Sequence, residues 1–432
     1  MLVHTTCASD IYFIHVFIKT VLIMVDIMIR DGETVTLSVV EGNLIVGRNA
    51  IINSESGEIK VKGAIICHGS CTFEGDVVAK RLECDNCRRG VVEINGNLEV
   101  DRINISNGSL LVKGDLVAEK IDIDNKLQVF GNLQAEIISV GGKVNVMGTV
   151  VAEDIDVGGG FKAEMDVSAT KISVGGTIEI KGTVISEYID AGGVAKIGGG
   201  EVTKISVGGK FKCEGDLEFN TMSVGGFVEI TGNIKGELIS VGGTVSILGD
   251  FEIGTIDVGG KLIVRGTGVG ETINVGGKVE VDRSLEVKDI ISVGGSVKVS
   301  EGLIANKISI GGKVEAKIIR ANEVKVGGAI KTTLGLKASV VEIGKGGTIE
   351  GFVVAEKVKI RAKAKADTIY AGEIMVEKGA KVKSLFGKRI YLRNCKIEGN
   401  VFYTETLEIE GNVKFAKEPQ KVDKLPEPIE FN

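Results

Sequence analysis

The sequence predicts an all-β protein, a single-stranded, three-faced parallel β-helix with about 17 residues per coil and about 22 coils. Three observations lead to this expectation. A Gly-Gly pair recurs at a nearly constant interval, aliphatic residues alternate in pairs between the glycines, and a chain with 61 Gly contains only 3 Pro. A Gly-rich chain without Pro in its body is neither collagen nor a disordered linker. Its many Val and Ile residues favour strands.

The Gly-Gly repeat is the strongest of these signals. Each pair follows a small aliphatic residue, and successive pairs are 17, 17, 17, 16, 17, 17, 17, 17, 18, 17 and 16 residues apart. The residues that precede the pairs are Val140, Val157, Val174, Ala191, Val207, Val224, Val241, Val258, Val275, Val293, Ile310 and Val326. Such a register is typical of repeat proteins in which each unit packs only against its neighbours.

The unit Ile138–Asp154 shows how one coil is built. Its inward aliphatic pairs are Ile138 and Val140, Val144 and Val146, and Val150 and Ala152. Alternate residues of a strand point to the same side, so each pair faces the interior and the unit makes three short strands. The three corners between them are Gly141-Gly142, Met147-Gly148 and Glu153-Asp154. We expect the corner glycines to supply positive φ values, which other residues resist.

The same spacing continues on both sides of the Gly-Gly array. Coils begin at Leu44, Ile65, Leu82, Ile103 and Ile121 upstream, and at Val341, Val358, Ile374, Ile390 and Leu407 downstream. The long step from Leu82 to Ile103 indicates an insertion around Cys87–Gly90. These limits predict an N-terminal apolar segment at residues 1–30, a β-solenoid at 31–417, and a disordered Pro-containing tail at 418–432.

The N-terminal apolar run, Ile11–Ile29, has several interpretations. It contains His15, Lys19 and Asp26, which argues against a membrane span. It also lacks the basic start and small-residue cleavage site of a signal peptide. The alternatives that stay open are a start at Met24 or Met28, which leaves a short amphipathic cap, and a peripheral contact with a membrane.

A strip of short polar residues lies between the first two inward residues of each coil. Its members are Ser139, Asp156, Ser173, Asp190, Ser206, Ser223, Ser240, Asp257, Asn274, Ser292 and Ser309. Such a strip could bind cations or ice, but Ser outnumbers Asp and no threonine array is present. We expect these side chains to bond the corner amides instead, as Asx and Ser/Thr turns do.

Cys67, Cys71, Cys84 and Cys87, with His68 between them, have the only spacing that suggests a metal site or a redox pair. The repeat gives another interpretation, because Cys67, Cys71 and Cys84 occupy inward positions and only Cys87, in the insertion, is unexplained. The seven cysteines show no evident pairing, which favours a reducing compartment. We therefore assign no metal ligands.

No catalytic or cofactor-binding residue is assigned either. The chain has 3 His and no Ser/His/Asp set, phosphate-binding loop or zinc-protease motif. Its Gly-Gly pairs recur in every coil, so they are corners rather than one phosphate site. The expected protein is not an enzyme, and it has no cofactor and no small-molecule substrate. Its net charge of −6 also argues against nucleic-acid binding by the whole chain.

The charge is unevenly distributed, with a basic segment at Lys357–Arg393. Its cations are Lys357, Lys359, Arg361, Lys363, Lys365, Lys378, Lys381, Lys383, Lys388, Arg389 and Arg393. The only acids there are Asp367, Glu373 and Glu377. This segment could dock on anionic lipid or on another protein, or stack against the acidic end of another rod. A solvated lysine-rich face is the alternative.

Two C-terminal stretches, Val341–Ile360 (VEIGKGGTIEGFVVAEKVKI) and Ile390–Phe415 (IYLRNCKIEGNVFYTETLEIEGNVKF), resemble the bactofilins, a family of polymer-forming cytoskeletal proteins. The resemblance implies a right-handed β-helix that polymerises end to end without nucleotide, often at a membrane. Two features depart from that family: the coils are far more numerous, and only residues 418–432 resemble its Pro-rich tails. Left-handed hexapeptide acyltransferases fit less well, because they need a catalytic His and one main inward residue per face.

The first functional hypothesis is therefore a cytoplasmic structural protein, with or without membrane attachment, that binds further copies of itself end to end. An open solenoid end exposes unpaired strand edges, which favours such stacking. The alternative is a monomeric scaffold or binding module that docks a partner or an anionic membrane through its basic C-terminal segment.

Overall fold

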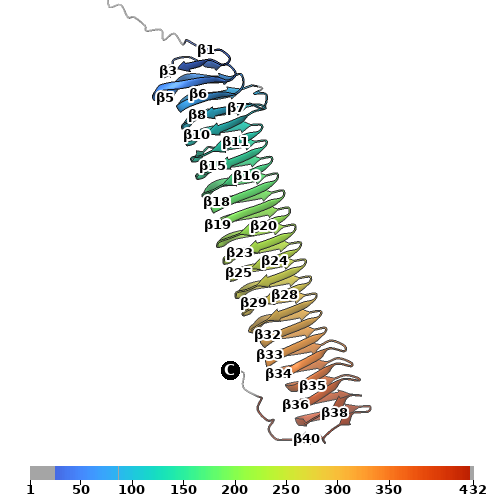
Figure 1. The fold of residues 1–432 in the computed structure, drawn as a ribbon. Helices are drawn as coiled ribbons and strands as arrows, with labels where there is room; N and C mark the ends of the chain where they lie inside the picture. The colour runs from blue at the N-terminus through green and yellow to red at the C-terminus, as the bar shows by residue number, and fades with distance from the viewer. Residues whose placement is uncertain (1–24, 86, 429–432) are drawn as a thin grey trace, which may run out of the picture.

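The computed structural model describes residues 25–85 and 87–428, which form one long rod of stacked coils (Figure 1). These residues contain 40 strands and no helix. The strand pairings are parallel, and each joins a coil to the next coil along the rod. The predicted all-β parallel solenoid is confirmed.

Short strands predominate, and longer strands that continue through a corner occur near the N-terminus, in the middle of the rod and near the C-terminus. The first group is β1 (Ile27–Ile29), β2 (Thr34–Thr36), β3 (Val39–Val40), β4 (Leu44–Val46), β5 (Ala50–Cys67), β6 (Cys71–Cys84), β7 (Val91–Ile94), β8 (Leu98–Ile105), β9 (Ser109–Val112), β10 (Leu116–Ile123), β11 (Lys126–Val129), β12 (Leu133–Gln134) and β13 (Ile137–Val140). The second group is β14 (Lys143–Val146), β15 (Val150–Val157), β16 (Gly160–Ala163), β17 (Val167–Val174), β18 (Thr177–Ala191), β19 (Val194–Val207), β20 (Lys210–Cys213), β21 (Leu217–Val224), β22 (Phe227–Ile230), β23 (Ile234–Val241), β24 (Thr244–Ile247), β25 (Phe251–Val258) and β26 (Lys261–Val264). The third group is β27 (Gly268–Val275), β28 (Lys278–Val281), β29 (Leu285–Val293), β30 (Ser296–Val299), β31 (Gly302–Ile310), β32 (Lys313–Val326), β33 (Ala329–Ile343), β34 (Thr348–Ile360), β35 (Lys365–Val376), β36 (Lys381–Arg393), β37 (Lys396–Ile397), β38 (Val401–Glu410), β39 (Lys414–Phe415) and β40 (Gln420–Lys421).

The strand register fixes the number of coils. One unbroken column of paired residues runs through Ile27, Leu44, Ile65, Leu82, Ile103, Ile121, Ile138, Ile155, Ile172, Ile189, Ile205, Met222, Ile239, Ile256, Ile273, Ile291, Ile308, Val324, Val341, Val358, Ile374, Ile390 and Leu407. The solenoid thus has about 23 coils, one more than expected because β1 precedes Leu44. At a strand spacing of about 4.8 Å the rod is about 100 Å long.

A coil in the middle of the rod shows the three faces. In the coil that begins at Ile138, strands β13, β14 and β15 carry the predicted inward pairs, and these are buried except for the half-buried Ala152. The third corner differs from expectation, because β15 continues unbroken through Glu153-Asp154 into the next coil. The main-chain amides of both corner residues donate to the carbonyl of Glu136 in the preceding coil. This corner therefore bends without leaving the sheet.

The Gly-Gly corners need glycine for a different reason from the one expected. None of these repeated pairs has a φ in the left-handed region. The glycines with a positive φ, such as Gly199 and Gly200, lie elsewhere in the chain. Instead, the corners stack directly on one another. A Cβ built on Gly225 would lie 2.2 Å from the carbonyl oxygen of Gly208 in the coil before it. The close approach of successive backbones excludes a side chain, so the positive-φ prediction is wrong here.

Two insertions lengthen coils near the N-terminus. The predicted one lies between Cys84 and Val91 at the first corner. A second, which the sequence reading missed, lies between Asn53 and Glu58, where the pairing of β5 with β6 shifts register. Gly57 there has a φ of 86°. The same long step, from Leu44 to Ile65, was visible in the sequence spacing.

The two ends of the chain continue the solenoid further than the domain limits suggest. Residues 1–24, and with them most of the N-terminal apolar run, lie outside the described residues, but its end forms β1. In the tail predicted to be disordered, β40 pairs with β38 and the amide of Val422 donates to the carbonyl of Tyr403 at 2.9 Å. The start of this tail thus forms the third face of the last coil.

Candidate functional site

The strip of Ser and Asp residues on the first face is stacked in register but does not bond the corner amides. Ser139, for example, pairs with Asp156, and Asp156 pairs with Ser173. The amide of Gly158 at the adjoining corner donates to the carbonyl of Val140 instead. Only Asn274 and Asp257 form a side-chain hydrogen bond along the strip among the described residues, at 2.9 Å. The expectation that the side chains of this strip bond the corner amides is therefore wrong.

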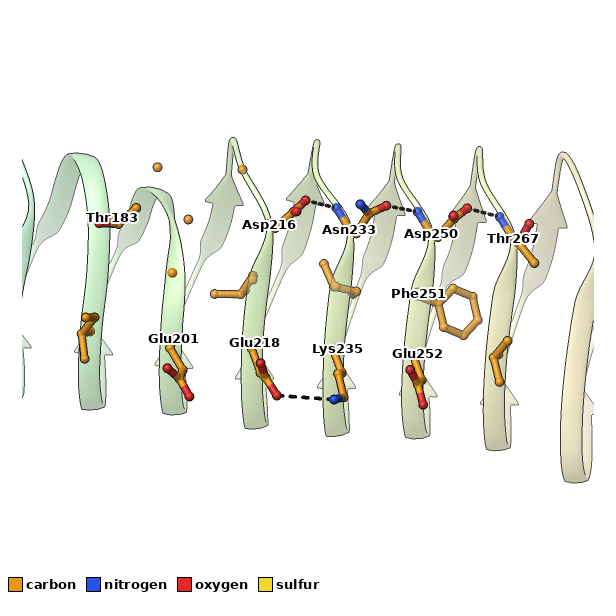
Figure 2. Close-up of a pocket in the computed structure, with 18 residues that line it drawn as sticks. Thr183, Glu201, Asp216, Glu218, Asn233, Lys235, Asp250, Phe251, Glu252 and Thr267 are labelled. Carbon is orange, nitrogen blue, oxygen red and sulfur yellow. Dashed lines mark hydrogen bonds and ion pairs between the residues drawn. The ribbon is translucent and has the colours of Figure 1, made fainter.

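The side chains that bond corner amides in an extended series lie at the second corner. The carboxylate of Asp216 accepts from the amide of Asn233 at 2.7 Å, and the Asn233 side-chain oxygen accepts from the amide of Asp250 at 2.9 Å. Asp250 accepts in turn from the amide of Thr267 at 2.7 Å (Figure 2). A similar series runs from Asp76 to Thr149. We call these residues the Asx ladder. Its signal in the sequence is Asp, Asn or Thr repeated once per coil, 17 to 21 residues apart.

A shallow groove of about 990 Å³ lies beside this ladder. It forms where the strand register shifts at Gly198, Gly199 and Gly200, which shorten the second corner by one residue. The ladder residues border one side (Figure 2). On the other side Lys235 pairs with Glu218 at 3.7 Å. The ladder amides already have acceptors, so the groove offers few polar groups that are not engaged within the rod.

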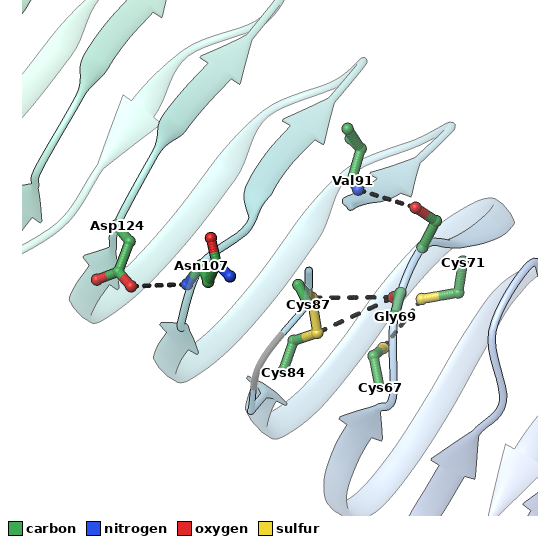
Figure 3. Close-up of a disulfide and its surroundings, with 9 residues drawn as sticks. Cys67, Gly69, Cys71, Cys84, Cys87, Val91, Asn107 and Asp124 are labelled. Carbon is green, nitrogen blue, oxygen red and sulfur yellow. Dashed lines mark hydrogen bonds between the residues drawn. A yellow bond between two sulfur atoms is a disulfide. The ribbon is translucent and has the colours of Figure 1, made fainter. Parts of the chain in front are cut away.

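The four clustered cysteines come together at the first corner of two adjacent coils (Figure 3). Cys84 and Cys87 form a disulfide with a Cα–Cα distance of 5.7 Å. The Cys71 thiol donates to the sulfur of Cys67 at 3.0 Å. Cys67, Cys71 and Cys84 are buried as expected, and Cys87 is buried too. Within residues 25–85 and 87–428, no group of three or more His, Cys, Asp or Glu residues is arranged to hold a metal ion.

The basic segment divides into paired and free cations. Six of its cations form ion pairs: Lys357, Lys359, Arg361, Lys383, Arg389 and Arg393. Arg389, for example, bridges Glu373 and Glu405, which raises its pKa and lowers the pKa of Glu373. Carboxylates of the rod therefore balance about half of the positive charge of this segment.

Four of the remaining cations lie together at the first corner, and we call them the lysine edge: Lys363, Lys365, Lys378 and Lys381. All four are exposed, and none has a described carboxylate within ion-pair distance. Lys365 pairs in register with Lys381, and the amide of Lys363 donates to the carbonyl of Lys378 at 3.0 Å. Adjacent coils thus place like charges side by side, and Glu398 lies near enough to Lys381 and Lys365 for them to help lower its pKa.

The C-terminal end of the rod is open within the described structure. Ile409 occupies an inward position but is 51% exposed, whereas its counterpart one coil earlier, Leu392, is fully buried. No described strand pairs with the far side of Leu407–Glu410. Core side chains and strand edges are therefore presented at this end.

The fold defines a β-solenoid repeat protein. No protein-family description, no curated protein and no solved structure matches the chain. The resemblance to bactofilins, and the right-handed coil that it implies, thus stay predictions from the sequence. No helix in the described part of the chain is long and apolar enough to span a membrane.

Proposed function

We propose that this protein is a structural, polymer-forming element whose rods associate end to end without a nucleotide. The observation that carries the proposal is the open C-terminal coil, where Ile409 is exposed at a position that is buried one coil earlier. Unpaired parallel strand edges and exposed core side chains favour the addition of another coil. A second copy supplies that coil.

The charges at the two ends support head-to-tail stacking. Residues 25–58 contain six acidic and two basic residues, whereas residues 378–428, which include the described tail, contain eleven basic and seven acidic residues. A basic end that approaches an acidic end is attracted and correctly oriented. Two like ends would repel each other. The expected filament is therefore polar, with every rod pointing the same way.

The test compares two substitutions of exposed isoleucines. Ile409→Lys puts a charge on the open end, and Ile185→Lys puts the same charge at mid-rod, where Ile185 is 60% exposed. Loss of an apolar contact costs about 1.5–3 kcal/mol, so we expect Ile409→Lys to raise the concentration needed for assembly by about tenfold or more. Ile185→Lys should leave it unchanged. Sedimentation velocity over a concentration series and negative-stain electron microscopy provide the readout.

Two outcomes would argue against end-to-end assembly. One is wild-type protein that stays as single rods about 100 Å long at every salt and protein concentration. The other is equal loss of assembly in both variants, which would point to a lateral contact or a general loss of solubility.

A second candidate function is attachment to an anionic membrane, and the lysine edge is the observation that favours it. Each Lys near an anionic surface contributes about 1 kcal/mol. Replacing Lys363, Lys365, Lys378 and Lys381 by Gln should reduce binding to phosphatidylserine vesicles in a flotation assay by about tenfold or more. The matched control replaces four ion-paired cations, Lys357, Lys359, Lys383 and Arg393, by Gln. Equal losses of vesicle binding in both variants would mean that net charge alone drives binding. No loss of binding in either variant would exclude the lysine edge as a membrane-binding surface.

A further inference from the structure

The four clustered cysteines lie in a closer arrangement than the filling of a core requires. Ile66 pairs with Glu83, so the next residues, Cys67 and Cys84, lie side by side in adjacent coils. Gly69, between Cys67 and Cys71, turns its carbonyl oxygen toward the neighbouring disulfide, 3.9 Å from both of its sulfurs (Figure 3). The segment that joins the two thiols therefore contacts the disulfide of the next coil.

The backbone around Cys87 holds it in this position. Its amide donates to the carbonyl of Ser106 at 3.0 Å, and the amide of Val91 donates to the hydroxyl of Ser70 at 3.1 Å. A Cβ on Gly108 would lie 2.4 Å from the Cβ of Cys87, so the next coil has room for Cys87 only because residue 108 is glycine. Arg88 and Arg89 have φ values of 52° and 65°. The inserted corner is therefore shaped to return Cys87 to the interior.

The other two described cysteines provide a contrast. Cys213 and Cys395 are buried singly, and burial raises the pKa of each thiol to about 11. They behave as small apolar residues. Four of the six described cysteines, by comparison, lie within one corner. A tetrahedral thiolate metal site needs four separate sulfurs about 2.3 Å from one centre, whereas two of these sulfurs are bonded to each other.

We propose that Cys67, Cys71, Cys84 and Cys87 form one redox-active site, in which the Cys67/Cys71 dithiol and the Cys84–Cys87 disulfide exchange. Residues paired between neighbouring strands are about 4.8 Å apart. A disulfide spans Cα distances of roughly 4.4 to 6.8 Å. A mixed disulfide between Cys67 and Cys84 is therefore within reach without movement of the coils.

The exchange balances without an external oxidant. The Cys67 thiolate attacks the sulfur of Cys84; the Cys67–Cys84 bond forms, the Cys84–Cys87 bond breaks, and Cys87 leaves as a thiolate that takes up the proton lost by Cys67. The Cys71 thiolate then attacks the sulfur of Cys67. The Cys67–Cys71 bond forms, the mixed disulfide breaks, and Cys84 takes up the proton from Cys71. One disulfide thus moves from one coil to the next.

Burial makes this exchange slow. The hydrogen bond that Cys67 shares with Cys71, together with the buried surroundings, raises the pKa of the Cys67 thiol well above its ordinary value. Its thiolate is consequently scarce at neutral pH. Uncatalysed disulfide rearrangement already takes minutes to hours, so both arrangements can be trapped by acid quenching, which protonates the thiolates, followed by alkylation of the unfolded chain.

The sequence makes the test direct, because trypsin cuts after Lys62, Lys80 or Arg81, and Arg88. One peptide then carries Cys67 and Cys71, and a separate peptide carries Cys84 and Cys87. The full-length protein is incubated in glutathione buffers of graded potential, alkylated, digested and analysed by mass spectrometry. Among chains with a single disulfide, we expect some to carry it in the Cys67/Cys71 peptide and the others to carry it in the Cys84/Cys87 peptide. Cys213 should stay a free thiol throughout.

A trapping variant tests the intermediate. With Cys71→Ser and Cys87→Ser, only Cys67 and Cys84 of the cluster are left, and oxidation should join the two peptides. The control, Cys67→Ser with Cys87→Ser, should give about tenfold less of the joined product, because its remaining cysteines are not paired in register. Circular dichroism verifies that both variants stay folded.

Three results would overturn the proposal. The disulfide could stay on Cys84–Cys87 at every potential. The trapping variant could fail to join the peptides while folded. Finally, the native protein could hold a metal ion on four free thiols, as measured by elemental analysis.

Discussion

Glycine acts in this chain mainly through the side chain that it lacks. At the repeated first corners the backbones of successive coils approach so closely that a Cβ on Gly225 would overlap the carbonyl oxygen of Gly208. The spacing of the glycines predicted the positions of these corners, but the sequence did not show why the corners require glycine. A sequence shows that Gly is required and leaves two causes open, positive φ and close approach, which only the relative position of neighbouring coils distinguishes.

A pair of glycine substitutions tests this cause. Gly225→Ala should destabilise its coil by about 1–3 kcal/mol, because the backbone must shift to admit the methyl group. Gly302→Ala is the matched control, since its Cβ would meet only the side chains of Ile318 and Ser284, at 3.6 and 3.7 Å. Hydrogen exchange measured by mass spectrometry reports the opening of each coil. Equal exchange in the two variants would contradict the stacking argument.

A single carboxylate at the second corner, Asp166, gives a pH-dependent prediction. The main-chain amide and the hydroxyl of Thr183 both donate hydrogen bonds to the Asp166 carboxylate. These bonds, the amide's first, lower the pKa of Asp166 from the ordinary value of 3.8. A lowered pKa means that Asp166 stabilises the fold above pH 3.8 and that this contribution is lost as the pH falls through the folded-state pKa.

The comparison is between the wild type and Asp166→Asn, which keeps an acceptor oxygen but does not titrate. The melting temperature of the wild type should exceed that of the variant at neutral pH, and the difference should shrink below pH 3.8. A difference that is constant over the whole pH range would show that the charge of Asp166 has no part in it.

Among the elements, the corners differ more than the strands. The strands repeat inward aliphatic pairs, so the sequence spacing alone predicted their register. The corners have to satisfy main-chain amides. The Gly-Gly corners do so with carbonyls of the preceding coil, whereas the second corner combines such carbonyls with the side chains of the Asx ladder. The Ser and Asp strip was assigned this task because it adjoins Gly-Gly. In the structure its side chains project from the middle of a face, away from the corner amides.

Breaking the Asx ladder should loosen one corner. Asn233→Ala removes the acceptor for the amide of Asp250 and should cost about 1 kcal/mol. Ser240→Ala removes a polar side chain from the first-face strip and serves as the control, because no described hydrogen bond depends on the Ser240 hydroxyl. The exchange rate of the Asp250 amide provides the readout. If Ser240→Ala reduced the protection of the Asp250 amide as much as Asn233→Ala does, the strip of Ser and Asp residues would be the one that stabilises the corner amides.

The cysteine cluster shows how far spacing can predict a site. The repeat placed Cys67, Cys71 and Cys84 in the core, and they are buried there. It gave no position for Cys87, because the conformation of an insertion depends on the coils above and below it. Gly108, which lies 21 residues further along, makes the space that Cys87 occupies. That dependence on a neighbouring coil has no local signature in the sequence.

For the whole molecule, the distribution of charge matters more than the total. The net charge of −6 hides an acidic N-terminal end and a basic C-terminal end about 100 Å apart. Single rods in dilute solution repel one another weakly, but opposite ends attract at short range. Salt screens such attraction with a Debye length of about 10 Å at 0.1 M.

Salt should therefore act on assembly in a specific direction. If rods stack head to tail, raising the ionic strength from about 0.05 to 0.5 M should slow filament growth and raise the concentration required for it. The apolar contact at Ile409 is not screened, so assembly should weaken without being abolished. Light scattering during a salt titration measures both effects. Growth that accelerates with salt would show that repulsion between the acidic rods outweighs the attraction of their ends, and it would favour a lateral contact over end-to-end stacking.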